Sequence, residues 1–181
     1  MTTTWKVDPS HSEIEFKARH LMITNVTGKF RTFEGTVETE DDDFTRSKIS
    51  FWADVASIDT GEPNRDAHLR SDDFFAASEH PKLTFTSTRI EKTDDPDRYQ
   101  VWGTMSIRGI SKEIRLDVES GGQIKDPWGN TRAGFEMTAK VNRKEFGLKW
   151  NAVTEAGGIV VSDEIRIHCA VEIVKEAEVM A

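Results

Sequence analysis

Apolar and polar residues alternate along most of the chain, and this period of two is the feature that most restricts its fold. Near the end of the chain, for example, Ile165, Ile167, Cys169, Val171 and Ile173 occupy every second position. Alternation of this kind is typical of a β-strand that buries one face. Helical periodicity of any length is missing from the sequence, so we predict an all-β protein.

Eight segments show the strand-like pattern. They are residues 12–20, 26–40, 47–58, 82–92, 98–108, 112–124, 131–142 and 159–175. Short polar turns join several of them, as antiparallel hairpins require. Eight such segments in a row predict an up-and-down antiparallel barrel, because closure removes exposed sheet edges. No repeat or linker interrupts the chain, so we expect residues 1–181 to form one domain.

Two segments break the rhythm. Residues 59–81 and 142–148 read as short helical excursions, with Pro63 suited to a first helical turn and Ser71 suited to cap a second one. A connection as long as 59–81 is unusual for a hairpin and typically forms a lid or a functional loop. Its apolar pair, residues 74–75, predicts a plug for one barrel end, with a gate over a cavity as the alternative.

Composition excludes several classes of protein. The chain carries 24 Lys and Arg against 32 Asp and Glu, a net charge of −8. This acidic balance disfavours nucleic-acid binding and docking on anionic membranes. No apolar run approaches the roughly 18 residues of a membrane helix. The first residues show no cationic start followed by an apolar run, so we expect a cytoplasmic protein without stable membrane insertion.

Catalytic and cofactor motifs are largely missing from the sequence. It has no nucleophile elbow, phosphate loop, dinucleotide fingerprint or zinc-protease motif, and its single cysteine, Cys169, excludes an internal disulfide. We therefore predict no catalytic residues, cofactor or metal. His20 and His68 are open to two interpretations: hydrogen-bonded structural histidines, or a metal or catalytic pair. Arg143, with residues 65–66, is expected to form buried ion pairs that pin the excursions to the barrel, the alternative being that one of these arginines binds an anionic ligand headgroup.

Aromatic residues and methionines lie in or beside the strands. A filled core explains them, and so does a pocket for a long apolar molecule, which is lined mainly by such side chains. The spacing of Phe30 and Phe33, three residues apart, also predicts a bulge or a change of face within 26–40.

The sequence as a whole resembles the YceI-like family. The resemblance runs in order through nearly the whole chain, and its most specific block is RDAHLRSDDFF at residues 65–75. The other matching blocks are residues 5–12, 16, 19–21, 26–30, 33–35, 57–61, 80–85, 103–110 and 142–148.

The resemblance implies an extended, lipocalin-like barrel of eight antiparallel strands that holds a long amphiphile, either a polyisoprenoid or a fatty-acid-like chain. It also implies a homodimer and no catalytic residues. Many family members carry export signals, and this chain is expected to differ from them in that respect. We therefore expect a non-enzymatic lipid-binding protein that transports or stores such a ligand. The alternatives are an enzyme that uses His20 and His68 on a small amphiphile, and a filled barrel that serves in stress or interaction.

For the lipid-binding reading, the expected ligand-binding residues form an apolar lining and a polar end. The lining is expected to comprise Phe16, Phe30, Phe51, Leu69, Phe74, Phe85, Met105, Phe135 and Trp150. The candidates for the polar end are His20, His68 and Arg143.

Overall fold

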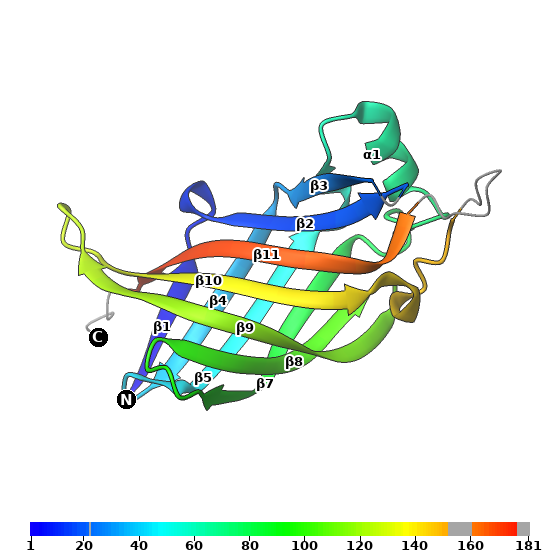
Figure 1. Cartoon of the computed structure of the whole chain (residues 1–181). Helices are drawn as coiled ribbons and strands as arrows, with labels where there is room; N and C mark the ends of the chain where they lie inside the picture. Colours follow the sequence, from blue (N-terminus) through cyan, green and yellow to red (C-terminus); the bar gives the residue numbers. More distant parts are fainter. Residues whose placement is uncertain (22, 152–160, 177–181) are drawn as a thin grey trace.

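A computed structural model describes residues 1–21, 23–151 and 161–176 of the chain (Figure 1). The strands are β1 (Thr2–Val7), β2 (Glu13–His20), β3 (Thr24–Phe30), β4 (Phe33–Glu40), β5 (Asp43–Asp54), β6 (Ile58–Asp59), β7 (Lys82–Lys92), β8 (Arg98–Ile107), β9 (Ile110–Lys125), β10 (Thr131–Asn142) and β11 (Val161–Lys175). One α-helix, α1 (Pro63–Arg70), and three 3₁₀ turns, η1 (Pro9–His11), η2 (Val55–Ser57) and η3 (Arg143–Phe146), complete the described elements.

The strands form one closed antiparallel barrel. Neighbours run β1-β4-β5-β7-β8-β9-β10-β11, and β1 pairs back to β11 through Trp5–Lys175, Lys6–Val174 and Val7–Ile173. Around one half of the barrel, β2 continues β1 after η1, β3 leads into β4, and β6 continues β5 after η2. When β1 with β2, β3 with β4, and β5 with β6 are each counted as one interrupted strand, eight strands close the barrel, as the alternation predicts.

The strands of the structure differ from the predicted segments in two places. The strand β1 was not predicted, because its first residues are three threonines and only Trp5 and Val7 give it an apolar face. The segment 26–40 is broken between Phe30 and Phe33, where β3 ends and β4 begins, so the predicted irregularity is confirmed. Residues 159–160 of the last predicted strand lie outside the described residues.

The apolar residues of the barrel interior form two clusters. One surrounds Phe74, Phe85 and Phe146 near the end that carries α1, and the other surrounds Trp5 and Val171 toward the opposite end. Partly buried side chains pack against both clusters and connect them; these are Val7, Ile14, Ile49, Phe135, Met137 and Ile167. The interior is therefore continuous along the barrel axis.

Two glycines allow aromatic rings to lie flat across a neighbouring strand. A Cβ atom on Gly28 would collide with the ring of Phe16, and one on Gly103 would collide with the ring of Phe85. The Gly103 position is also close to the main chain, since its Cβ would lie 2.6 Å from the carbonyl oxygen of Thr86. These glycines therefore fix where two interior rings can sit.

The predicted excursion over 59–81 contains α1 and the turns that follow it. Glu62 caps the helix by accepting hydrogen bonds from the amides of Asn64 and Arg65, and Pro63 occupies the first turn as predicted. Ser71 ends α1 as its C-cap, so it does not begin a second helix.

The residues predicted to brace this excursion act separately. Within the described ranges, Arg65 and Asp66 form no buried ion pair; each binds Thr60 instead, Asp66 through the amide of Thr60 at 2.9 Å. The second excursion is the single turn η3, as predicted, and it ends at Gly147 with a φ of 78°. None of the described helices has both the length and the apolar character that a membrane crossing requires.

Candidate functional site

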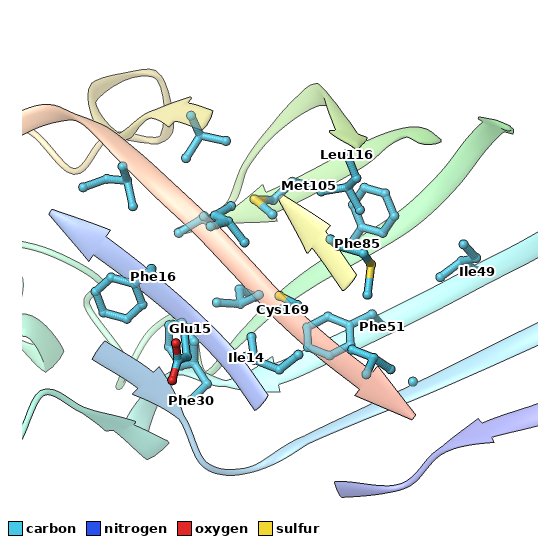
Figure 2. A pocket seen from close by; sticks show the side chains of 18 of the residues that line it. Ile14, Glu15, Phe16, Phe30, Ile49, Phe51, Phe85, Met105, Leu116 and Cys169 are labelled. Atoms are coloured by element: carbon cyan, nitrogen blue, oxygen red, sulfur yellow. The ribbon is translucent and has the colours of Figure 1, made fainter. Parts of the chain in front are cut away.

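The barrel encloses an apolar cavity of about 230 Å³ (Figure 2). Figure 2 shows Phe16, Phe51 and Met105 directed from different strands toward the same space. Among the described lining residues, all are apolar except Glu15, Gly35, Thr36, Ser50 and Arg143. Apolar protein cavities of about 150 Å³ already bind molecules the size of benzene. The cavity therefore suits an apolar guest, and the barrel is not completely filled.

Nine of the twelve sequence-predicted site residues line this cavity. They are Phe16, Phe30, Phe51, Leu69, Phe74, Phe85, Met105, Phe135 and Arg143. The prediction omitted other lining residues, among them Ile49, Leu116, Met137, Ile167 and Cys169. Most of these could have been found, because Met137, Ile167 and Cys169 share the alternating apolar face of their strands. Burial raises the pKa of the Cys169 thiol to about 12, so this thiol is protonated and unreactive.

The excursion that carries α1 forms a lid over one end of the cavity. Leu69, Phe74 and Phe75 contribute to the cavity wall, and the ring of Phe75 meets that of Phe30 edge-on at 6.1 Å. Arg108, in the β8–β9 turn, donates hydrogen bonds to the carbonyls of Phe74 at 2.8 Å and Gly147 at 3.2 Å. Both excursions are thereby fastened to one hairpin, which supports the predicted plug.

His68, on α1 of the lid, and Trp150 pack together and are not among the described residues that line the cavity. Their rings meet edge-on at 4.7 Å, and each also contacts the ring of Phe74. The Nε2 atom of His68 is 2.8 Å from a carboxylate oxygen of Asp73. We therefore assign both residues to the packing of the lid, which is the structural interpretation of His68.

His20 ends β2, where it pairs with Thr24 and Val161, and it is outside the cavity lining. Its carbonyl accepts a hydrogen bond from the amide of Ile23 at 3.1 Å, but the described part of the chain gives its imidazole no hydrogen bond and no ion pair, to His68, a carboxylate or any other group. The convergence of His20 and His68 that an enzyme or a metal centre would need is therefore not observed among the described residues.

Arg143 is buried in the cavity wall, with 3% of its surface exposed, and its donors are directed away from the cavity. Its Nε atom donates to the carbonyl of Ser162 at 2.9 Å, and Nη1 donates to the carbonyls of Leu148 and Trp150. Nη2 reaches the carbonyl of Val161 at 3.4 Å. Burial lowers the pKa of the guanidinium, although an arginine stays charged in proteins. Arg143 therefore braces this part of the fold mainly through main-chain carbonyls, while the nearest carboxylate, that of Asp163, lies 3.9 Å from Nη2.

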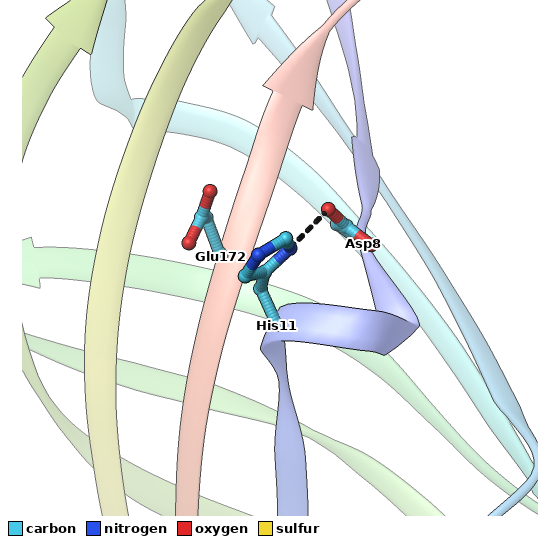
Figure 3. A group of neighbouring side chains, drawn as sticks. All are labelled: Asp8, His11 and Glu172. Carbon is cyan, nitrogen blue, oxygen red and sulfur yellow. Dashed lines mark hydrogen bonds and ion pairs between the residues drawn. The ribbon is translucent and has the colours of Figure 1, made fainter. Parts of the chain in front are cut away.

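A second polar cluster lies at the other end of the barrel, where Asp8, His11 and Glu172 come together (Figure 3). These three could hold a metal ion by their spacing, but Arg132 already occupies the carboxylates. It donates to Asp8 at 2.9 Å, to Glu172 at 2.8 Å and to Asp126 at 2.8 Å. The cluster is an ion-pair network that joins η1, β11 and the β9–β10 turn to β10, and it was not predicted from the sequence.

Replacing Arg132 with methionine is expected to destabilise the fold and to flatten its acid dependence. The hydrogen bond from Arg132 is the largest cause that lowers the pKa of Asp126, to about 2, and hydrogen bonds from Ser10 and Arg132 lower that of Asp8 further. Because these folded-state pKa values lie below the unfolded value of about 4, the network stabilises above pH 4 and is lost toward pH 2. Urea unfolding of the wild-type protein and the variant at pH 7, 4, 3 and 2 measures the free energy of unfolding.

The matched control for that experiment is Arg98→Met. Arg98 pairs with Asp95 and Glu119 at an exposed position, 57% of its side chain being accessible, so its loss is expected to change stability little. An Arg132→Met protein whose stability followed the wild-type curve between pH 4 and 2 would contradict the network's assigned role.

The closed antiparallel barrel with a lidded apolar interior defines the class of the protein as a lipocalin-like barrel. Its sequence matches the YceI-like domain over residues 5–173. The chain therefore belongs to the YceI-like family.

Curated relatives support the same assignment. A UPF0312 protein of Pectobacterium atrosepticum is 36% identical over 92% of this chain and 82% of its own length. A UPF0312 protein of Staphylococcus epidermidis is 33% identical over 94% of this chain and 96% of its own.

Solved structures share the fold. The YceI protein of Campylobacter jejuni has a TM-score of 0.75 and 33% identity over 88% of this chain and 90% of its own. BcnA of Burkholderia cenocepacia has a TM-score of 0.80 at 21% identity over 92% of this chain and 98% of its own. A polyisoprenoid binding domain from Saccharophagus degradans has a TM-score of 0.66 at 15% identity, covering 93% of this chain and 97% of its own. The last two likenesses concern the fold alone.

Proposed function

We propose that this protein binds a long-chain amphiphile, an isoprenoid or a fatty-acyl chain, inside the barrel and acts as its carrier or store. The observation that carries the proposal is the lidded cavity with its apolar lining. Burying a hydrocarbon chain there contributes about 0.8 kcal/mol for each methylene removed from water, so a long chain binds with few polar contacts.

Membership of the YceI-like family supports the proposal in general terms, without naming the ligand. Its membership suggests a binding protein, and one fold neighbour is described as a polyisoprenoid binding domain. Because that neighbour is only 15% identical to this chain, the likeness speaks for a barrel able to enclose a ligand, and the lining of this cavity supplies the argument for a lipid.

The two alternatives have less support. An enzyme that uses His20 and His68 needs the two imidazoles at one centre, and the described contacts of each lead elsewhere. A barrel filled by its own side chains is at odds with the 230 Å³ cavity. We therefore favour binding over catalysis.

The first experiment is native mass spectrometry of protein purified without detergent, followed by organic extraction and identification of what is released. We expect a stoichiometric mass excess that resolves to a prenyl or acyl lipid, or uptake of such a lipid after loading. The same spectrum shows whether the subunits form the homodimer that the family resemblance implies. A protein that remains bare after exposure to C20 prenols, quinones, prenyl phosphates, fatty acids and fatty amides would overturn the proposal.

A paired substitution on β11 tests whether the cavity is the site. Ile167 faces the cavity, whereas its neighbour His168 is exposed on the outer face. Ile167→Trp is expected to fill cavity space and to weaken lipid binding about tenfold, equivalent to about two methylenes lost from contact, while His168→Trp leaves binding unchanged. Equal lipid occupancy in the two variants would show that the ligand lies elsewhere.

A further inference from the structure

A second cavity, of about 340 Å³, opens at the end of the barrel opposite α1. It lies among the β4–β5 turn, the end of β7, the start of β8 and the adjoining part of β9. Its described lining mixes polar and apolar side chains, and the polar ones include Thr39, Asp42, Lys92, Tyr99 and Gln123. It differs in this from the inner cavity, whose lining is almost entirely apolar.

The two cavities share a wall. Val37, Phe44, Phe135 and Ile173 line both of them. Within this wall the ring of Phe44 stacks on that of Phe135, with centroids 5.1 Å apart and an angle of 20°. Phe44 also meets the ring of Tyr99 edge-on at 4.9 Å. These four side chains, two of them stacked aromatic rings, thus form a partition between the two cavities.

The backbone around this partition is irregular on both sides. Phe44 falls in the stretch of β5 where pairing with β4 shifts register between Glu38 and Glu40. Phe135 adjoins the register shift between β9 and β10. Bulges redirect side chains and are frequent at barrel rims and beside functional sites. The two rings that meet at the partition are therefore placed by local departures from regular pairing.

The polar groups available to a ligand lie on the far side of the partition. In the inner cavity, the guanidinium of Arg143 is bound to main-chain carbonyls, and the carboxylate of Glu15 pairs with Lys29 at 3.3 Å. In the second cavity, Lys92 and Gln123 are exposed and Tyr99 is half-buried, and their side chains make no hydrogen bond or ion pair with the described residues. A ligand's polar end buried without a partner in the inner cavity would be costly, whereas in the second cavity it meets these side chains and water, so it favours the second cavity.

We propose that the two cavities form one channel, in which the ligand's hydrocarbon chain fills the inner cavity and passes Phe44, and its polar end lies in the second cavity beside Lys92, Tyr99 and Gln123. The inference rests on the proposed function and names its ligand class as an amphiphile with one compact hydrogen-bonding end. It replaces the expectation that His20, His68 and Arg143 hold that end.

A photoreactive probe tests the placement directly. The probe is a C20 prenol with a diazirine next to its hydroxyl group, loaded into the full-length protein and checked by native mass spectrometry before irradiation. We expect the label in the peptides that contain Lys92, Tyr99 and Gln123. Label at His20, His68 or Trp150 would overturn the placement while leaving the proposed function intact. Failure of the probe to load would overturn both.

Substitutions in the second cavity give an independent readout. Lys92→Met combined with Gln123→Leu is expected to weaken binding of the C20 prenol about three- to tenfold, since one or two hydrogen bonds are lost, and to leave binding of the matched C20 hydrocarbon unchanged. Lys140→Met, at an exposed position on β10, is the charge-matched control. An equal loss for prenol and hydrocarbon would mean that these side chains do not contact the polar end.

Discussion

Replacing Arg143 with methionine is expected to lower the free energy of unfolding by about 3–5 kcal/mol, because a buried acceptor left without its donor costs about 1–3 kcal/mol and several are orphaned together. The carbonyls of Leu148, Trp150 and Ser162 all accept hydrogen bonds from this one guanidinium. Methionine fills similar space and donates nothing. Urea unfolding followed by tryptophan fluorescence at pH 7 measures the loss.

The design includes a conservative variant and a second readout. Arg143→Lys keeps the charge, but one ammonium group cannot reproduce the forked geometry, so we expect it to recover only part of the stability. If Arg143 instead held an anionic headgroup, the Arg143→Met protein would keep its stability and lose affinity for a prenyl phosphate relative to the matched prenol. That pattern would contradict the bracing role.

Replacing Gly103 with alanine is expected to destabilise the protein by about 2–4 kcal/mol, at or above the usual cost of overpacking. The new Cβ atom would collide with the ring of Phe85, and it would lie 2.6 Å from the carbonyl oxygen of Thr86, which belongs to the strand ladder and cannot move cheaply. Thermal and urea unfolding give the magnitude. Displacement of Phe85 also predicts weaker lipid binding, since its ring lines the inner cavity.

Gly134→Ala is the matched control, because a Cβ atom at Gly134 meets nothing within 4 Å. We expect this variant to have unchanged or slightly higher stability, because alanine reduces the entropy of the unfolded chain. Similar losses in the two variants would mean that glycine is needed in these strands for backbone reasons, and would contradict a collision with the Phe85 ring as the cause.

Most of the barrel could be predicted because its cause is local. An inward-facing residue at every second position follows from the pleat of a strand, and the pairing of Met137 with Cys169 joins two such faces. The strand β1 escaped prediction because threonine is neither clearly apolar nor clearly polar. The breaks at η1 and η2 depend on how the barrel bends, and this is not a property of either segment alone.

The same difference, between features with a local cause and features that depend on distant segments, decides which residues of the candidate site could be predicted. Aromatic residues on inward faces could be assigned to the lining from sequence, and eight of the nine predicted lining residues do line the inner cavity. The polar candidates could not be assigned, because their partners are distant in sequence: Arg143 is satisfied by the carbonyls of Val161 and Ser162, 18 and 19 positions further along the chain. Arg132 likewise finds Asp8, 124 positions away.

The seam that closes the barrel has a consequence for how the protein is made. The pairing between Trp5–Val7 and Ile173–Lys175 joins segments from the two ends of the chain. During synthesis, therefore, β1 leaves the ribosome long before its partner exists, and its edge and the apolar interior stay open until β11 has been translated. Such distant pairing slows folding and exposes unpaired strands to aggregation. We accordingly expect the nascent chain to need protection by chaperones until its last strand is released.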